Sequence, residues 1–271
     1  MRKGILGFDI WFYGIVAMLL AVCQQPLVLG GLMLFVMLVE KDEWLNRQVM
    51  QALLLCLGAM AVSLLVHKLS AVFAIVPLFG WMLRWGVDQV VDLLLLLGMA
   101  LFAIRAADRL ILPGVGAFGD AMAKLTATGL VPVLKEQAKQ KPLLGICLGM
   151  QLLFEKSYEY GEHAGLGFIK GEVCPLGPDL ADKSLKVPQM GWNALHIVKD
   201  DALFRYIREG EYVYYVHSYY GKNCAESTLA ISDYSIPVTG AVRAGRVYGT
   251  QFHPEKSGDT GLRILKAFAE L

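Results

Sequence analysis

Hydrophobic and polar positions divide this chain into two parts of different character. Charged residues are sparse from Ile10 to about Ala107, where long apolar runs follow one another. The runs are Ile10–Cys23, Leu27–Val39, Val49–Val66, Ala71–Leu83 and Val90–Ile104. A helix that crosses a bilayer needs roughly 17 to 25 apolar residues. Because these runs lack the polar face of a soluble bundle helix, residues 1–103 are predicted to form a transmembrane helical region of about four spans. A buried soluble bundle is the alternative.

The pattern changes after Ala107, where the chain becomes charged and punctuated by glycine. Short apolar strands at 110–112 and 143–146 alternate with helical spacing over 120–140 and from Leu148 towards Tyr158. Such alternation favours a mostly parallel sheet covered by helices. Later stretches are β-rich, at Glu211–His217, Leu229–Asp233, Val238–Arg243 and Val247–Phe252. Residues 104–271 are therefore predicted to form a three-layer α/β domain with a β-rich latter part.

Composition supports this division. The 271 residues are 56% hydrophobic, above the roughly 45 to 50% of ordinary soluble domains, and the excess lies in the front part. A net charge of +1 without a basic stripe gives no indication of nucleic-acid binding. The 5 cysteines show no CxxC or histidine-rich spacing, so neither a disulfide framework nor a zinc site is predicted.

One cysteine stands in a frame that the others lack. Cys147 follows the apolar strand 143–146 and lies between Gly145 and Gly149. A residue at such a strand-to-helix turn is held in a strained, exposed position, and neighbouring glycines let substrate and backbone approach closely. The N-terminus of the following helix lowers a thiol pKa. The pattern predicts a thiol nucleophile, with a buried structural cysteine beside a tight turn as the alternative.

A histidine far downstream supplies a base for this thiol. His253 follows the apolar strand 247–252, so its imidazole is expected at a strand end. Pro254 stiffens the turn, and Glu255 can accept the other imidazole N–H, which sets the tautomer and orientation of the ring. The sequence therefore predicts a catalytic triad of Cys147, His253 and Glu255.

The turn Pro113-Gly114-Val115-Gly116 supplies a third element after the strand 110–112. Its backbone N–H groups can face a developing oxyanion, and the N–H of Leu148 would complete the hole. An ordinary loop is the alternative for this tetrapeptide taken alone. It is not a dinucleotide-binding fingerprint, because no acidic residue ends a second strand about twenty positions on.

Together these motifs carry a family resemblance. Residues from about Ile104 to Leu271 resemble a class I, triad-type glutamine amidotransferase, and within that class the glutaminase subunits of imidazole glycerol phosphate synthase. The nucleophile run and the His-Pro-Glu run are shared across the class. Four segments narrow the resemblance: Leu112–Met122 (LPGVGAFGDAM), Val187–Asn193 (VPQMGWN), Tyr215–Tyr220 (YVHSYY) and Gln251–Ser257 (QFHPEKS).

The resemblance implies a role for each matching residue. Cys147 would attack the side-chain amide of glutamine, with His253 moving protons and Glu255 orienting it. Oxyanion and glutamine contacts would come from Gly114, Gly116, Leu148, Gln151, Ser218 and Tyr219. The surface facing a synthase partner would include Met190, Trp192 and Lys256. Plain core packing of Trp192 and a solvated charge at Lys256 are the alternatives, and no metal or other cofactor is implied.

The resemblance also implies a partner. In this family ammonia passes into a separate (β/α)8 barrel, the cyclase subunit of a heterodimer. That subunit converts the phosphoribulosyl formimino precursor, PRFAR, into imidazole glycerol phosphate and AICAR in histidine biosynthesis. The catalytic domain is accordingly expected in the cytoplasm.

The chain departs from the family pattern before Ile104. A family member would begin with a strand, a turn containing glycine and asparagine, a helix and a second strand, and residues 1–103 contain none of these motifs. Leu93–Ile104 has the length and leucine content of a membrane helix rather than of a substitute strand. The charged segment 40–53 resembles instead small four-span membrane proteins of the Tic20-like type.

Three explanations of this departure stay open. A natural fusion could tether a glutaminase to a membrane, or a gene model could join a membrane protein to a truncated amidotransferase. A membrane-anchored interaction protein with an inactive amidotransferase-like domain is the third. The intact triad residues Cys147, His253 and Glu255 favour the two enzymatic explanations.

Overall fold

The computed structural model describes residues 57, 58, 60–62, 64, 89, 90, 94, 97, 98 and 100–271. The chain divides into two units, and the second of them, Ala103–Leu271, contains every strand named below. The predicted membrane spans lie largely outside the described residues, as does the segment 40–53. No helix in the described part of the chain is long and apolar enough to cross a membrane. Residues 100–106 are helical, as the sequence predicts for the end of the run at Leu93–Ile104.

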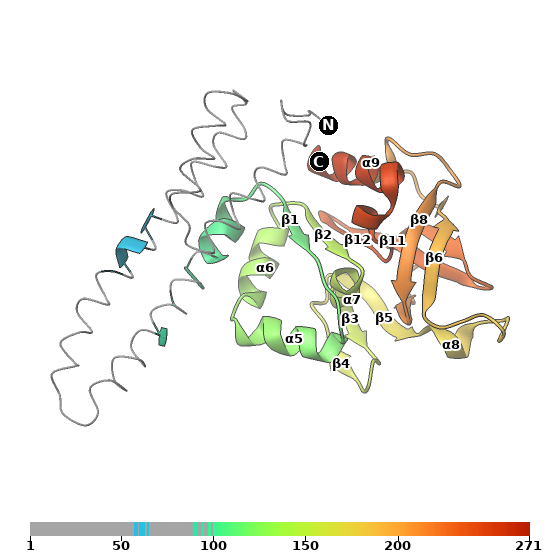
Figure 1. Ribbon diagram of the computed structural model, residues 1–271, viewed down its shortest axis with the longest axis horizontal. Coiled ribbons are helices and arrows are strands. Elements are labelled where there is room, and N and C mark those ends of the chain that lie inside the picture. Colours follow the sequence, from blue (N-terminus) through green and yellow to red (C-terminus); the bar gives the residue numbers. More distant parts are fainter. Residues whose placement is uncertain are drawn as a thin grey trace. The chain divides into compact units, whose positions relative to one another are not determined.

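The second unit alternates strands and helices at first and then becomes mostly strand (Figure 1). Its helices are α5 (Phe118–Ala127), α6 (Val131–Ala138), α7 (Leu148–Leu152), α8 (Leu176–Asp179) and α9 (Gly258–Ala269), with 3-10 turns η3 (Ala202–Phe204) and η4 (Pro254–Lys256). Its strands are β1 (Leu110–Leu112), β2 (Leu143–Ile146), β3 (Phe154–Ser157), β4 (His163–Ala164), β5 (Ile169–Pro175), β6 (Gln189–Ala194), β7 (His196–Ile197), β8 (Tyr212–His217), β9 (Tyr219–Lys222), β10 (Thr228–Asp233), β11 (Pro237–Ala244) and β12 (Val247–Thr250).

A six-stranded sheet forms the centre, in the order β1-β2-β12-β11-β10-β7. Strands β1, β2 and β12 are parallel, with Leu112 opposite Gly145 and Gly249 opposite that same glycine on the other side. Strands β11, β10 and β7 continue the sheet in antiparallel fashion. Two smaller sheets, β4-β3-β5-β9 and β6-β8, complete the β structure. The carboxyl ends of β1 and β2 therefore lie at one edge, beside the end of β12.

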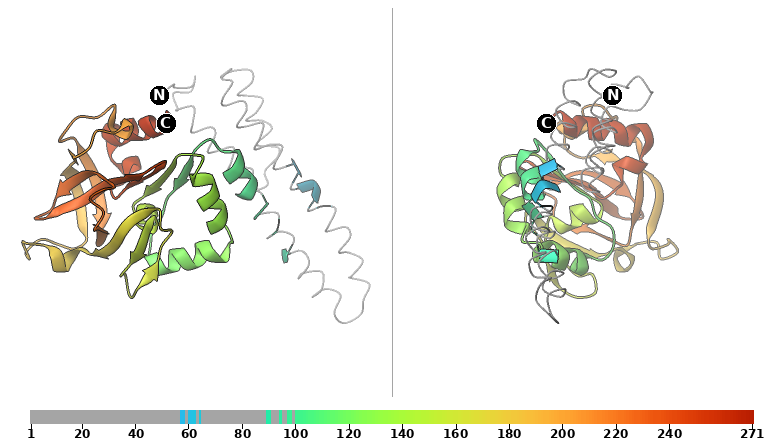
Figure 2. Two further views of the ribbon diagram at one scale, coloured as in Figure 1. Left: turned by 180° about the vertical axis from the view of Figure 1, so that it is seen from behind. Right: turned by 60° about the vertical axis from the view of Figure 1, so that its left-hand side comes forward.

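Both faces of the central sheet are covered, which confirms the predicted α/β class. Successive residues of a strand point to opposite faces, and in β2 both Leu143 and Leu144 are fully buried. Leu143 packs in a cluster that includes Leu134 of α6, whereas Leu144 packs in one that includes Ile264 and Phe268 of α9. The helices α5 and α6 thus lie over one face and α9 over the other (Figure 1; Figure 2).

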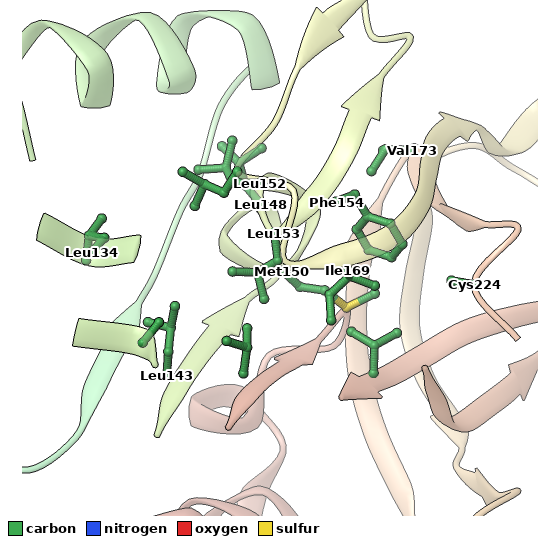
Figure 3. Close-up of a cluster of buried hydrophobic side chains, with 14 of the residues drawn as sticks. Leu134, Leu143, Leu148, Met150, Leu152, Leu153, Phe154, Ile169, Val173 and Cys224 are labelled. Carbon is green, nitrogen blue, oxygen red and sulfur yellow. The ribbon is translucent and has the colours of Figure 1, made fainter. Parts of the chain in front are cut away.

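The short helix α7 is held by the first of these clusters (Figure 3). Met150 is fully buried there, together with Leu153 and Phe154. A Cβ placed on Gly249 of β12 would lie 2.7 Å from Met150 Cγ, so the helix packs directly on the sheet. Because α7 begins immediately after Cys147, this packing also sets the position of that residue.

The structure corrects two predicted helices. The helix expected from Leu148 towards Tyr158 ends at Leu152, because the next residues form β3 and pair with β5 instead. The single stretch expected over 120–140 is two helices, since Gly129 adopts φ +69 between them. In the first case long-range strand pairing overrides local helical spacing, and in the second a residue without a Cβ supplies a left-handed turn.

Truncation of the Met150 side chain tests the importance of this packing. We expect Met150→Ala to lower the free energy of unfolding by about 2 to 5 kcal/mol, because a fully buried side chain leaves a cavity. Urea denaturation followed by tryptophan fluorescence measures the change. Met190→Ala is the matched control: its side chain is 63% exposed, so a change within about 0.5 kcal/mol is expected. Equal changes in unfolding free energy for the two substitutions would contradict the role of Met150 as a core residue.

Candidate active site

Cys147 occupies a sharp turn between β2 and α7. Its backbone has φ 53 and ψ −111, a conformation that residues other than glycine rarely adopt. A Cβ on Gly149 would lie 1.8 Å from the Leu112 carbonyl oxygen, and one on Gly145 would lie 2.6 Å from the Gly149 carbonyl oxygen. Both positions therefore require glycine. The strained turn predicted for the cysteine is present, and the close packing of the surrounding backbone holds it in this conformation.

The surroundings of the thiol differ from the sequence-based prediction. Cys147 is only 9% exposed, rather than solvent-exposed. Burial raises the pKa of the Cys147 thiol to about 11, although the Leu148 N–H acts in the opposite direction. The carboxylate of Glu255 raises this pKa further. The prediction of a lowered thiol pKa is therefore wrong for the free protein, because desolvation of a thiolate outweighs one backbone hydrogen bond. The thiol needs a base to become nucleophilic.

His253 lies near Cys147 because their strands are neighbours. Strand β12 runs parallel to β2, with Thr250 opposite Ile146, and the Cys147 N–H donates to the Thr250 carbonyl at 2.7 Å. His253 follows β12 at the same edge and is 4% exposed. Its backbone N–H donates to the Tyr214 carbonyl, which fixes the main chain at this point.

The imidazole of His253 is oriented by the residue that the sequence predicted. Its Nδ1 lies 2.6 Å from Glu255 Oε1, so the carboxylate accepts the Nδ1 proton. The ring nitrogen that remains to take a proton is Nε2. The hydroxyl of Ser257 donates to the His253 carbonyl at 2.6 Å and tightens the same turn.

The glycine-rich turn after β1 lies against the start of α7. A Cβ on Gly114 would lie 3.0 Å from the Gly149 backbone nitrogen and 3.1 Å from Leu148 Cβ. Gly116 adopts φ +103, which favours glycine. The structure thus brings Gly114 and Leu148, two of the predicted oxyanion residues, into contact beside Cys147.

A buried network of amides links the thiol to the predicted glutamine-binding residues. Gln251 Nε2 lies 3.8 Å from Cys147 Sγ. Gln151 Nε2 donates to Gln251 Oε1 at 3.1 Å and to the Tyr219 carbonyl at 2.9 Å. His217 Nδ1 lies 2.9 Å from that same carbonyl. The Tyr219 carbonyl therefore accepts two hydrogen bonds from buried side chains.

Sequence reasoning did not single out Gln251 and His217 as site residues. Both lie in segments that carried the family resemblance, next to residues that were singled out. The available signal was a polar residue at a position that the strand pattern buries: Gln251 is 0% and His217 6% exposed. Such a residue needs internal hydrogen-bond partners.

The junction of β8 and β9 holds the remaining predicted glutamine contacts. Ser218 connects the two strands, and its carbonyl accepts the N–H of Leu176 at 2.9 Å. The Tyr219 carbonyl belongs to the amide network described above. With both carbonyls engaged by the protein, this backbone is fixed before any substrate arrives.

The predicted partner-facing residues lie at the surface. Met190 is 63% and Trp192 52% exposed on β6, and Lys256 is exposed in η4. The Trp192 ring contacts Tyr214 edge-on, with centroids 6.0 Å apart. The alternative of plain core packing for Trp192 is therefore excluded. A Cβ on Gly258 would lie 3.8 Å from the Trp192 ring, which brings this strand close to the turn that carries Lys256.

Comparison with known proteins agrees with this geometry. A family model described as glutamine amidotransferase class-I matches residues 97–270. The chain belongs to the class I glutamine amidotransferase family. This membership confirms the resemblance inferred from the motifs and the prediction that the chain is an enzyme.

Curated relatives of this chain include subunits of imidazole glycerol phosphate synthase. Imidazole glycerol phosphate synthase subunit HisH of Wolinella succinogenes is 54% identical over 166 residues, which are 60% of this chain and 81% of the relative. The subunit of the same name from Lacticaseibacillus casei is 52% identical over 169 residues, 62% of this chain and 79% of the relative. A solved glutamine amidotransferase structure matches with a TM-score of 0.44 at 16% identity, over 65% of this chain and 94% of that one.

The pH dependence of alkylation tests the thiol environment. Because burial raises the Cys147 pKa to about 11, the rate of alkylation by iodoacetamide without glutamine should rise roughly tenfold per pH unit from pH 7 to pH 10. Mass spectrometry of the peptide containing Cys147 measures the rate, and Cys147→Ser controls for label elsewhere. An alkylation rate that levels off near neutral pH would show that the thiolate is already formed, and it would contradict a thiol pKa raised by burial.

Proposed function

We propose that residues 104–271 hydrolyse glutamine to glutamate and ammonia as the glutaminase subunit of an imidazole glycerol phosphate synthase. The observation that carries the proposal is the strained turn at Cys147 beside the paired His253 and Glu255, on neighbouring parallel strands. The 54% identity to a HisH subunit supports the choice of synthase.

The first half of the reaction forms a thioester. Sγ of Cys147 attacks the side-chain amide carbon of glutamine while His253 takes the thiol proton at Nε2. The raised thiol pKa makes this transfer part of the attack rather than a step before it. Backbone N–H groups at Leu148 and the Gly114 turn stabilise the oxyanion. The C–N bond then breaks, and the leaving nitrogen takes a proton from His253 and departs as ammonia.

The second half restores the enzyme. His253 removes a proton from water as the water oxygen attacks the thioester carbon, and the C–S bond then breaks. The proton returns to the Cys147 sulfur and glutamate leaves. Glu255 holds the imidazole in one orientation throughout and stabilises its protonated form, as a triad carboxylate does.

The remaining predicted residues divide between substrate and partner. The Gln151 side chain binds glutamine, and the backbone of Ser218 and Tyr219 holds its amino acid end. The buried amide network that joins these residues supports the proposal. Met190, Trp192 and Lys256 form the surface for a cyclase subunit, which converts PRFAR to imidazole glycerol phosphate and AICAR. Their exposure suits an interface of aromatic, methionine and basic side chains.

Replacement of the nucleophile tests the activity. Cys147→Ala should lower glutamine hydrolysis roughly 10³-fold or more, because the triad acts as one unit. The partner's use of free ammonium should be unchanged, since that reaction bypasses the thiol. Glutamate release with the cyclase subunit present measures the first rate, and Cys174→Ala serves as the matched control. Wild-type protein that is inert with glutamine and partner would refute the proposal.

Membrane association of residues 1–103 is a separate proposal that rests on their apolar runs alone. If these residues anchor the enzyme, the native protein should be found at its full length in the membrane fraction of lysed cells. Fractionation with an antibody against the 104–271 domain provides the measurement. A shorter product in the soluble fraction would show instead that the two parts are not joined in the cell.

A further inference from the structure

Four buried side-chain atoms have no hydrogen-bond partner within the described residues: Thr250 Oγ1, Arg109 Nε and two atoms that face each other across a strand pair. The last two are His217 Nε2 and Gln189 Oε1, and their side chains are 6% and 0% exposed. The two residues are direct partners across the antiparallel pair β6 and β8. Side chains at such positions lie on the same face, with Cβ atoms about 4.5 to 5.5 Å apart.

His217 presents a bare acceptor at Nε2. Its Nδ1 lies 2.9 Å from the Tyr219 carbonyl, and because a carbonyl can only accept, Nδ1 carries the proton. Burial lowers the pKa of His217 to about 4, and the nearby His253 lowers it too, against the effect of the Tyr219 carbonyl. The ring is therefore neutral at pH 7, and Nε2 is a lone pair without a proton.

Gln189 presents a second acceptor. Its Nε2 donates to Asn193 Oδ1 at 3.2 Å, and Asn193 Nδ2 donates in turn to the Asp233 carbonyl at 3.1 Å. This chain of donors sets the orientation of both amides, so the atom left over on Gln189 is its carbonyl oxygen. Two buried acceptors cannot satisfy each other, and each costs free energy until a donor reaches it.

The pair belongs to the hydrogen-bonded surroundings of the thiol. The residue before His217 is Val216, whose carbonyl lies 3.9 Å from Cys147 Sγ. The residue after Gln189 is Met190, which is largely exposed. His217 also shares the Tyr219 carbonyl with Gln151, which bonds Gln251 beside the Cys147 sulfur, so the pair adjoins the site where nitrogen is released.

We propose that His217 Nε2 and Gln189 Oε1 together bind the ammonia released at Cys147, each accepting one of its N–H groups. The inference rests on the proposed glutaminase function. Neutral acceptors in a buried position favour neutral ammonia over ammonium, because a buried charge without a counter-charge is costly. The site thereby keeps the nitrogen nucleophilic before it reaches the partner. Water also has donor hydrogens on its oxygen, so the experiment below distinguishes bound ammonia from bound water.

Isotope competition separates them in the complex of the full chain with the cyclase subunit. The complex is given glutamine labelled with 15N at the amide, together with unlabelled ammonium and the cyclase substrate. The 15N fraction in the imidazole product reports capture of internal ammonia, and glutamate release reports hydrolysis. Gln189→Met removes the acceptor at similar volume and should lower the 15N-labelled product formed per glutamate about fivefold, the effect of one lost hydrogen bond. Gln140→Met, at an exposed position, should match wild type.

Two substitutions separate the roles of the His217 nitrogens. His217→Asn keeps a donor near the Nδ1 position and removes Nε2, so it should lower 15N capture as Gln189→Met does. His217→Gln keeps an acceptor near the Nε2 position and loses the donor to Tyr219. It should preserve capture and raise the KM for glutamine instead.

Each outcome bears on the proposal. Unchanged capture in Gln189→Met with normal hydrolysis would mean that the pair holds only water, which overturns the proposal. Loss of hydrolysis in step with loss of product, at an unchanged ratio, would show a structural role and would overturn it as well. Wild-type protein that releases no glutamate would refute the glutaminase function itself, and the ammonia site with it.

Discussion

The close approach of α7 to the ends of β1 and β2 is the constraint on which the rest of the site depends. Gly149 lies where a Cβ would meet the Leu112 carbonyl at 1.8 Å, and Gly145 where one would meet Gly149 itself at 2.6 Å. This contact forces Cys147 into its strained conformation. It also brings the Gly114 turn against the Leu148 backbone. The proposed nucleophile and oxyanion donors are thus placed by one backbone contact, and the buried cluster around Met150 packs against the same helix.

Such packing has an electrostatic consequence. A turn this tight excludes water from Cys147, and the lost solvation raises its thiol pKa well above the ordinary value. A site of this kind cannot store a thiolate, so it depends on a base in a fixed orientation. The His253 and Glu255 pair meets that need because β12 ends beside β2. Burial of the nucleophile and pairing of the base are therefore two results of one arrangement of parallel strands.

Several buried polar side chains surround the proposed active site. Gln251, Gln151 and His217 join the thiol to the Tyr219 carbonyl through side-chain contacts in a buried region. A buried network of this kind stabilises the fold when every member is satisfied and penalises any atom that is not. Two of the four buried side-chain atoms without a partner in the described residues belong to His217 and Gln189. They are informative because buried polar atoms are nearly always hydrogen-bonded.

The sequence alone determined the chemistry and the class of fold. Two local patterns carried the prediction: a cysteine between glycines at a strand end, and a histidine followed by proline and glutamate. Such patterns can be recognised in the sequence because the conformation of a turn depends on adjacent residues. The alternation of apolar strands and helical spacing determined the α/β class in the same way. Membership of the class I amidotransferase family followed from these runs and is confirmed.

Only the tertiary structure decided the properties that depend on distant residues. The direction of the Cys147 pKa shift depends on how much of the chain covers the thiol. The end of α7 at Leu152 depends on pairing of β3 with β5, which competes with local helical preference. The parts played by Gln251 and His217 depend on partners up to 104 positions away. Burial and strand pairing depend on residues that are far apart in the sequence. They are therefore known only from the folded structure.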